Sequence, residues 1–321
     1  MTNKIIIVSG DPNSINSEII YKCYKKLNNN LRKKIYIIGN LNLLKKQFKK
    51  LGYIIDIYKV NNIFERNKKN GIKVINVDLK FKDPFKVPKQ YASKFIINSL
   101  NLAHKIAVNK DVGGIINCPI SKILLKKERI GVTEYLASKC KVFNDTEVML
   151  IRNKKLAVSP ITTHIDVKQI SRNIKTIKIT KKINTINNWF KKKINKKPKI
   201  GILGLNPHNA ELRKNSEEKK IIIPAILRSK KKGIKIHGPL IADTVFIKDY
   251  KKYDVIIGMY HDQILPSFKT LFKFDAINIT LGLKYLRTSP DHGTGLDIIG
   301  KNKANSSSLL SCIYFVKKFG K

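Results

Sequence analysis

The feature that most constrains the fold is the alternation of short β-branched runs with longer helix-like stretches along the whole chain. Runs such as "KIIIVSG", "KIYIIG", "GGIINC" and "DVIIGMY" predict strands, and stretches such as "SEIIYKCYKKL" and "YASKFIINSLNLAHKIAVNK" predict helices between them. This alternation predicts an α/β protein in which helices cover both faces of largely parallel sheets. Ligands of such proteins gather at the carboxyl ends of the strands, so we expect functional residues there.

The charge balance is the next constraint. The chain has 65 Lys and Arg residues against 22 Asp and Glu, a formal net charge of +43. Such an excess is typical of nucleic-acid-binding proteins. The lysines, however, occur in nearly every surface-like segment and accompany an excess of Asn and Ile, which is the composition that an AT-rich genome favours. We therefore attribute the charge to mutational bias, while expecting the surface to attract anions at low salt.

Length and local composition narrow the class of protein. A chain of 321 residues is expected to form one large or two medium domains. No run reaches the roughly 18 apolar residues of a membrane span, and "MTNKIIIVSG" predicts a first strand rather than a signal peptide. The cysteines are widely scattered and form no CxxC pair, which predicts neither a disulfide framework nor a thiolate zinc site. We expect a cytoplasmic protein without a membrane partner.

Three of the six histidines occupy equivalent places. His164 ends "AVSPITTH", His208 ends "IGILGLNPH" and His261 ends "VIIGMYH", so each follows an apolar, strand-like run. One such histidine alone is more often satisfied by local hydrogen bonds. Parallel strands, however, would bring all three to one edge, where neutral imidazoles bind a divalent metal and leave coordination positions open for catalysis. The repetition favours a metal site.

Two carboxylates are further candidates for this site. Asp262 directly follows His261, and Asp243 follows the Gly-Pro pair in "GPLIADTVF". Each could orient a ligand imidazole or accept a proton during catalysis. Each could equally be a turn-forming or helix-capping Asp. The sequence leaves both interpretations open.

The segment "NITLGLKYLRTSPDHGTGLDIIG" is unusually rich in polar groups. Gly293 and Gly295 would allow the backbone to approach a ligand closely. Arg287 and Lys269 could hold a phosphate or carboxylate, Arg287 through a bidentate fork. A solvated basic face is the alternative, and it applies more strongly to Lys269. The chain lacks GxGxxG, GK[ST] and GxSxG, so no Rossmann site, P-loop or nucleophile elbow is predicted.

Six blocks occur in one order: "GLNPH", "ADT", "MYHDQ-LP--K", "NITLGL", "RTS-DHGT" and "LD--G". With this order and spacing, the chain resembles the 4-hydroxythreonine-4-phosphate dehydrogenase family, NAD-dependent enzymes of pyridoxal phosphate synthesis. The resemblance covers nearly the whole chain and is densest between His208 and Gly300. The "MYHDQ" and "RTSPDHGTGLD" blocks are together highly specific.

The resemblance implies an α/β fold like that of isocitrate and isopropylmalate dehydrogenases, which bind NAD without a Rossmann fingerprint. Two α/β/α subdomains would have the active site in the cleft between them. We expect residues 1–125 with 284–321 to form the first, and residues 126–283 to form the second, with the metal ligands and dimer contacts. A homodimer with its active site at the interface is implied as well.

Site residues follow from the same resemblance. It assigns one divalent metal (zinc, magnesium or cobalt) to His164, His208 and His261. Substrate contacts are implied at the position of Val132 and at Thr133, Lys269, Asn278 and Arg287. The "DHGTGLD" block is implied to lie near the nicotinamide cofactor, NAD or alternatively NADP, through His292, Gly293, Thr294 and Asp297.

Several positions depart from the family pattern. The family's "G-H-T-E" is replaced by Gly131, Val132, Thr133 and Glu134, so a substrate-binding His is missing. Ser121 stands where relatives commonly have His, and "GDPNSINSEI" has lost the glycines of "GEPAGIGPE". Weakened activity and a shifted substrate are both compatible with these changes.

We therefore expect an enzyme that oxidises 4-phosphohydroxy-L-threonine with NAD and a divalent metal. Decarboxylation would then give 3-amino-2-oxopropyl phosphate, with Asp243 and Asp262 as candidate catalytic residues. One alternative is a dehydrogenase of a phosphorylated four-carbon acid, such as phosphothreonate or phosphoerythronate. The other is a nucleic-acid-binding protein on a decayed enzyme scaffold, which the intact histidine and "RTSPDHGT" blocks disfavour despite the +43 charge.

Overall fold

The computed structural model describes residues 4–65, 70–109, 111–128, 131–142, 146–273 and 275–320. The chain divides into two compact units, Met1–Cys140 with Leu283–Lys321, and Lys141–Gly282. From the sequence we expect these boundaries at residues 125 and 283. The structure divides the chain at 140 and 282, which leaves helix α5 (Val132–Lys139) in the first unit.

The first unit contains a parallel sheet in the order β3-β4-β2-β1-β5-β12. Its strands are β1 (Ile5–Val8), β2 (Ile35–Gly39), β3 (Ile57–Val60), β4 (Ile72–Asn76), β5 (Gly114–Asn117) and β12 (Arg287–Pro290). Isoleucine and valine dominate β1, β2 and β4, whose residues are almost all buried. That composition is typical of parallel strands covered on both faces.

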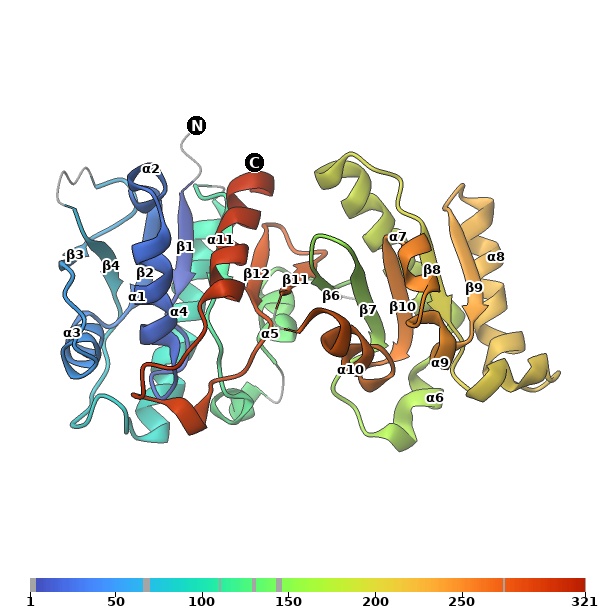
Figure 1. Cartoon of the computed structure of the whole chain (residues 1–321), viewed down its shortest axis with the longest axis horizontal. Coiled ribbons are helices and arrows are strands. Elements are labelled where there is room, and N and C mark those ends of the chain that lie inside the picture. The colour runs from blue at the N-terminus through green and yellow to red at the C-terminus, as the bar shows by residue number, and fades with distance from the viewer. Residues whose placement is uncertain are drawn as a thin grey trace. The chain divides into compact units, whose positions relative to one another are not determined.

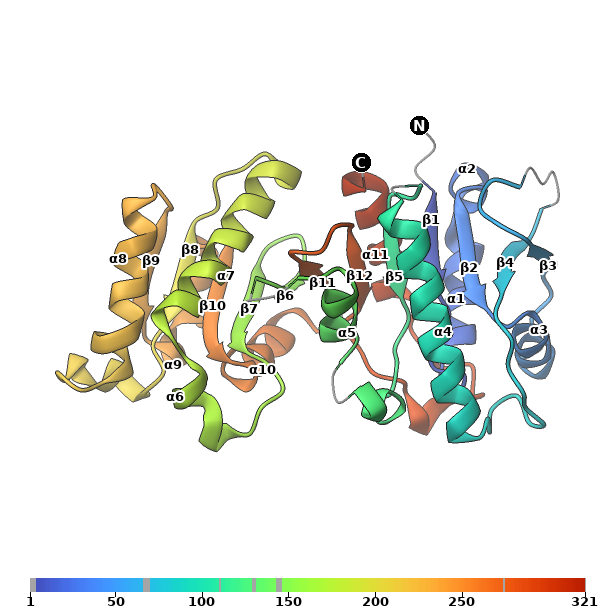
Figure 2. The ribbon, with the colours of Figure 1, turned by 180° about the vertical axis from the view of Figure 1, so that it is seen from behind.

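Helices cover both faces of this sheet. Helices α1 (Asn16–Lys26), α3 (Leu41–Lys50) and α11 (Ser307–Phe319) pack together on one face, as Figure 1 shows. Helix α4 (Lys89–Val108) covers the other face, in front in Figure 2. The unit is completed by α2 (Asn29–Arg32), α5 and two short 3-10 helices, Lys122–Glu128 and Leu296–Ile298.

The second unit contains a mixed sheet in the order β11-β6-β7-β10-β8-β9. Its strands are β6 (Val148–Arg152), β7 (Ala157–Thr162), β8 (Ile200–Leu203), β9 (Ile236–Leu240), β10 (Val255–Tyr260) and β11 (Ile277–Leu281). Strand β6 is antiparallel to both of its neighbours, whereas β7, β10, β8 and β9 are parallel. Four parallel strands therefore end at the same edge of the sheet.

Helices α7 (Thr176–Trp189) and α8 (Ile223–Lys231) pack together on one face of this sheet, and α10 (His261–Phe272) packs on β7 and β10 at the other face (Figures 1 and 2). Shorter helices connect these elements. They are α6 (Ile170–Asn173), α9 (Ala242–Val245), the π-helical turns Phe190–Ile194 and Glu218–Ile222, and the 3-10 segments Val167–Gln169, Pro207–Leu212 and Asp249–Lys252.

Each unit has its own hydrophobic cluster. In the first, Phe95, Ile96 and Leu100 of α4 pack on the inner residues of β1 and β2. In the second, Ile264, Leu265 and Phe268 of α10 pack against β7 and β10. Among the residues that the structure describes, no helix combines the length and apolar character needed to cross a bilayer.

The α/β fold predicted from the sequence is confirmed. Two prolines lie in helical segments. Pro224 is the second residue of α8, directly after the π-helical turn Glu218–Ile222, where the regular α-helical hydrogen bonding is already interrupted, and Pro266 lies inside α10. Pro266 removes the donor to the carbonyl of Asp262, and because Asp262 is exposed, water can hydrate that carbonyl instead.

Candidate functional site

The three predicted histidines follow three neighbouring strands of the second unit. Strand β10 lies between β7 and β8 and is parallel to both, so their carboxyl ends share one edge. His164 comes two residues after β7, His261 directly after β10, and His208 in the loop after β8. The expected placement of these strand ends is confirmed. Metal binding by the three imidazoles remains a prediction.

His164 and His261 lie together. Their ring centroids are 5.8 Å apart. His261 Nδ1 is 2.5 Å from Asp262 Oδ1, a distance at which the ring nitrogen donates to the carboxylate. In that tautomer Nε2 carries the lone pair, which is the form a metal ligand requires. Asp262 is therefore placed to orient the His261 ring, one of the two roles predicted for it.

His208 is held in an unusual backbone conformation. Five consecutive non-glycine residues, His208 to Leu212, have φ between 43° and 58°. A left-handed conformation costs about 1–2 kcal/mol per residue, so the surroundings must stabilise this turn. One such contact is the 3.0 Å hydrogen bond that Asn209 Nδ2 donates to the carbonyl of Pro239. The exposed His208 ring has Nε2 4.0 Å from Asp243 Oδ2.

A buried carboxylate fixes the loop that precedes His208. Glu218 accepts hydrogen bonds from the backbone N–H groups of Leu205 and Asn206, each at 2.8 Å, and from Asn206 Nδ2. Asn206 Nδ2 also donates to Glu217 at 2.9 Å. Burial alone would raise the pKa of Glu218, but the hydrogen bonds from Asn206 and Leu205 outweigh it, and the net pKa is lowered. The carboxylate therefore stays charged and holds the loop.

Gln263 joins the two histidine-bearing segments. Its Oε1 accepts from the backbone N–H of Met259, and its Nε2 donates to the carbonyl of Gly204, each at 2.7 Å. Met259 lies in β10 two residues before His261, and Gly204 directly follows β8. Sequence reasoning missed this role of Gln263, together with those of Asn206 and Glu218. The signal for Asn206 and Gln263 was their place inside the "GLNPH" and "MYHDQ" blocks, whereas Glu218 lies outside both blocks.

The donor types of this edge fit a divalent metal, since three imidazoles and two carboxylates come from adjacent loops. The distances between these side chains are less suited to a metal than their chemistry is. Within the described ranges, no three His, Cys, Asp or Glu side chains are close enough to form a metal-binding group. The structure pairs His164 with His261 and places His208 near Asp243 instead.

The first unit contains a buried arginine with fixed geometry. Arg287, only 2% exposed, begins β12. Its Nε donates to Asn117 Oδ1 at 2.6 Å, and its Nη1 donates to Thr133 Oγ1 at 3.2 Å. Burial lowers the pKa of Arg287 to about 10, with the nearby Glu134 opposing the shift, so the guanidinium is charged at neutral pH. Thr133 and Arg287, two of the predicted substrate contacts, are thus in direct contact. The role of Asn117 as a partner of Arg287 was not predicted from the sequence.

This arginine lies beside a helix N-terminus. Thr133 is the second residue of α5, at the end of the helix where the helix dipole is positive. A guanidinium and a helix N-terminus both favour anions. Val132, the first residue of α5, is half-buried and packs against the core of the unit. Its side chain therefore contributes apolar packing and offers no polar atom to a ligand.

The other two predicted substrate residues lie in the second unit. Lys269 is exposed on α10, and Asn278 is half-buried in β11. Asn278 Oδ1 is buried and has no hydrogen-bond partner in the described part of the chain. A buried amide oxygen without a donor is costly, so a ligand hydroxyl or ammonium group would stabilise it.

The "DHGTGLD" block packs against the loop after β1. The carbonyl of Thr294 accepts from the backbone N–H of Ile15 at 3.1 Å. His292 Nδ1 lies 3.0 Å from the carbonyl of Gly293, while its Nε2 is buried and has no partner among the described residues. Asp297 is exposed in the 3-10 helix that follows. Cofactor binding by these four residues remains a prediction.

The loop after β1 is itself held by a buried carboxylate. Asp11 accepts from the backbone N–H groups of Asn13 at 2.9 Å and Ser121 at 3.2 Å. Burial raises the pKa of Asp11. Ser121, a departure from the family pattern, therefore participates through its backbone, and its side chain is not needed for this contact.

Comparison with known proteins identifies the family. The family model of the pyridoxal phosphate biosynthetic protein PdxA matches residues 30–316. This chain belongs to the PdxA family. One relative, the 4-hydroxythreonine-4-phosphate dehydrogenase of Sulfurihydrogenibium sp. (strain YO3AOP1), is 39% identical, over 97% of this chain and 96% of its own length. The D-threonate 4-phosphate dehydrogenase of Salmonella typhimurium is 32% identical, over 96% of each chain.

A solved structure agrees with this assignment. The crystal structure of 4-hydroxythreonine-4-phosphate dehydrogenase from Klebsiella pneumoniae has a TM-score of 0.84 and 28% identity, and the match covers 100% of this chain and 98% of that one. These relatives are dehydrogenases, and this chain is an oxidoreductase.

Proposed function

We propose that this chain is the 4-hydroxythreonine-4-phosphate dehydrogenase of pyridoxal phosphate synthesis, with NAD as hydride acceptor. Family membership supports the reaction, and the observation that carries the choice of a phosphorylated substrate is the buried Arg287. A charged guanidinium fixed by Asn117 and Thr133 beside the N-terminus of α5 suits a small anion.

The proposed chemistry begins at the substrate's secondary hydroxyl group. Loss of its proton and transfer of a hydride to NAD give a ketone beside the carboxylate-bearing carbon. This β-keto acid then loses CO2, and protonation of the remaining carbanion gives 3-amino-2-oxopropyl phosphate. We propose that Arg287 and Thr133 bind the phosphate, and that Lys269 and Asn278 bind other polar groups of the substrate. We propose the "DHGTGLD" residues as the nicotinamide neighbours.

We propose His164, His208 and His261 as the residues that would hold a divalent metal. When bound, such a metal acts as a Lewis acid that lowers the pKa of a hydroxyl group and stabilises an enolate. Asp262 holds the His261 ring through Nδ1, and Asp243 lies 4.0 Å from His208 Nε2. Both carboxylates are candidates for accepting the hydroxyl proton, because each lies beside one of the proposed metal-ligating histidines.

A related phosphorylated four-carbon acid is the second candidate substrate. Two observations favour it: Val132 replaces the family's substrate-binding His, and one relative is a D-threonate 4-phosphate dehydrogenase. Threonate has a hydroxyl group where the amino acid has its ammonium group. The missing imidazole could therefore alter the preference between these two substrates.

The test is NADH formation with 4-phosphohydroxy-L-threonine, phosphothreonate and phosphoerythronate, each with and without a chelator. We expect NADH to form with one of these substrates, and we expect its formation to stop when the chelator removes the metal. His261→Ala should weaken divalent-metal binding and lower NADH formation at least 100-fold. His237→Ala is the matched control, because His237 is an exposed histidine on strand β9 of the same sheet. Full metal binding and full activity in His261→Ala would contradict the three-histidine site.

We also propose that the enzyme is a cytoplasmic homodimer, as the family resemblance implies. Light scattering on the purified protein measures the mass directly, and a mass near the 36.7 kDa of one chain would contradict the dimer.

A further inference from the structure

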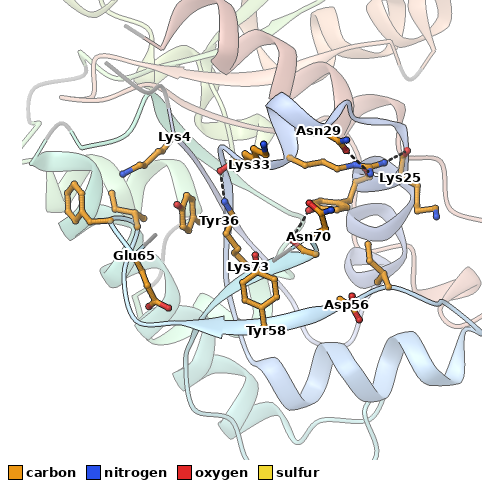
Figure 3. Close-up of a pocket in the computed structure, with 16 residues that line it drawn as sticks. Lys4, Lys25, Asn29, Lys33, Tyr36, Asp56, Tyr58, Glu65, Asn70 and Lys73 are labelled. Carbon is orange, nitrogen blue, oxygen red and sulfur yellow. Dashed lines mark hydrogen bonds between the residues drawn. The ribbon is translucent and has the colours of Figure 1, made fainter. Parts of the chain in front are cut away.

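A large cavity lies at the amino end of the sheet in the first unit, shown in Figure 3. Its volume is about 1010 Å³. Lys4, Lys33, Asp56 and Gly71 line it, and each lies one or two residues before a strand of the sheet. The cavity is therefore at the opposite end of the strands from Asn117, which closes β5 and contacts Arg287.

The lining is predominantly basic. It contains the cations Lys4, Lys25, Arg32, Lys33 and Lys73 and the carboxylates Asp56 and Glu65, a formal excess of three positive charges (five minus two). The lysine-rich composition of the chain is enough to explain the exposed members, Lys25 and Lys33. It does not explain Lys73.

Lys73 is a buried cation that forms no ion pair with a carboxylate of the described residues. The residue is only 7% exposed. Its Nζ donates to the carbonyl of Lys33 and lies 4.1 Å from the centroid of the Tyr36 ring. Burial, and next the charge of Lys4, lower the pKa of Lys73 to about 8. An ammonium group buried without a carboxylate is costly, so a bound anion would stabilise it.

Aromatic rings form another part of the wall. Tyr24, Tyr36 and Tyr58 all line the cavity, and Tyr24 and Tyr36 are buried. Two further cations are held against rings: Arg32 lies 5.2 Å from the Tyr24 centroid and Lys4 lies 4.5 Å from the Phe64 centroid. Figure 3 shows the Lys73 side chain rising from between the Tyr58 and Tyr36 rings towards Lys33. The cavity thus combines positive charge with flat apolar surfaces.

We propose that this cavity is a second ligand site, which binds a small aromatic phosphate monoester. A phosphate carries a charge of about −1.5 to −2 at neutral pH and three acceptor oxygens, which match the cationic excess and the Lys73 ammonium. A planar ring packs against the tyrosines. The volume is at the upper end of the roughly 300–1,000 Å³ of small-molecule sites. Pyridoxal phosphate, to which the family name refers, and nucleoside monophosphates share this chemistry.

The test is isothermal titration calorimetry at about 0.15 M salt, where the Debye length of about 8 Å screens non-specific attraction to the basic surface. The probes are adenosine monophosphate and pyridoxamine phosphate, which lacks an aldehyde and cannot form an imine with lysines. Inorganic phosphate, adenosine and pyridoxamine are the matched fragments. Saturating NAD is present throughout to occupy the proposed cofactor site, and the lysine variants below distinguish the cavity from the phosphate site proposed at Arg287.

We expect at least one aromatic phosphate to bind ten or more times more tightly than its fragments. Which probe binds shows whether the ligand is a nucleoside monophosphate or a pyridoxal phosphate derivative. Lys73→Met and Lys4→Met should each weaken that binding at least tenfold. Lys45→Met, an exposed lysine on α3 outside the cavity, removes the same charge and should change nothing. Lys4→Met carries the test if Lys73→Met fails to fold.

Two outcomes overturn the proposal. One is the absence of binding by both aromatic phosphates at millimolar concentration. The other is equal affinity in the wild type, Lys4→Met and Lys45→Met, which would show attraction to the surface in general. NADH formation, measured separately on the same variants, tests the proposed function and does not depend on either outcome.

Discussion

The residue at position 132, the first of α5, affects both the stability of the first unit and the proposed phosphate site. It packs against the core of the first unit, and it directly precedes Thr133, which accepts a hydrogen bond from Arg287. An imidazole at this position would add a donor next to the proposed phosphate site but would lose apolar packing. Activity and stability should therefore respond to its replacement in opposite directions.

We predict that Val132→His lowers KM for 4-phosphohydroxy-L-threonine about tenfold, because a hydrogen bond to a charged group contributes about 1.5–3 kcal/mol. We also expect the free energy of unfolding to fall by about 1 kcal/mol, because the valine packing is lost. Steady-state kinetics and urea denaturation measure the two effects. Val167→His, at a residue that is 79% exposed, is the matched control. An unchanged KM would mean that the site has adapted to another ligand.

At the scale of single residues, the sequence identifies functional residues that stand in a recognisable local pattern. His164, His208 and His261 are recognisable because each closes its own apolar, strand-like run. Asn117 was missed because its partner, Arg287, is 170 residues away in the sequence. Gln263 was missed for the same reason, since its partner Gly204 is 59 residues away. Side chains that hold a site together are defined by such distant contacts, which one sequence does not contain.

At the scale of elements, the strands found from sequence are those with continuous apolar runs, such as β1, β2, β7 and β10. Three strands were not predicted: β4, β9 and β12. Strand β12 reads "RTSP" and looks like a loop, yet it pairs with β5 through its backbone, and its arginine is satisfied by Asn117. Strand β9 contains Gly238 and Pro239, which normally interrupt strands. Tertiary pairing overrides local propensity at both places.

Another element that the sequence did not reveal is the left-handed turn from His208 to Leu212. Its conformation is unfavourable for every one of its residues, so no local pattern predicts it. Glu218, on the following π-helical turn, holds the loop that leads into it. The stability of this loop should therefore depend on the charge of one carboxylate.

We predict that Glu218→Gln lowers the free energy of unfolding by about 1–3 kcal/mol at pH 7. The oxygen that accepts from the backbone of Leu205 and Asn206 then carries no charge, and an amide donor replaces Oε2, which accepts from Asn206 Nδ2. The pKa of Glu218 is lower in the folded protein than its ordinary value of 4.5. Its contribution is therefore complete above pH 4.5 and is lost as the pH falls through the folded-state pKa. The difference between wild type and variant should shrink over that range.

Urea denaturation at several pH values measures this difference. Glu211→Gln, an exposed carboxylate in the same loop region, is the control and should differ little from wild type at every pH. A difference between wild type and Glu218→Gln that stays constant as the solution is acidified would contradict the role of the charge.

At the scale of the whole molecule, the charge of +43 is the feature most open to misinterpretation. Family membership assigns the chain to a group of enzymes with anionic substrates, for which a positive field raises the rate of encounter at low salt. The same field attracts nucleic acid without any specific site. The distinction between the two functions therefore depends on how binding changes with ionic strength, and on whether nucleic acid affects NADH formation.

We predict that the protein binds a 20-base-pair DNA duplex in fluorescence anisotropy at about 0.05 M salt, and that this binding weakens about 10³-fold or more by about 0.2 M. Contacts with phosphates release counterions, so a site of 6–10 such contacts loses affinity this steeply. At about 0.15 M salt, saturating substrate and NAD should give the same rate of NADH formation with and without DNA. A scrambled duplex is the control and should bind equally well at every salt concentration. Tight binding of one sequence at 0.2 M salt, together with no NADH from any phosphorylated hydroxy acid, would instead favour a nucleic-acid-binding protein on an enzyme scaffold.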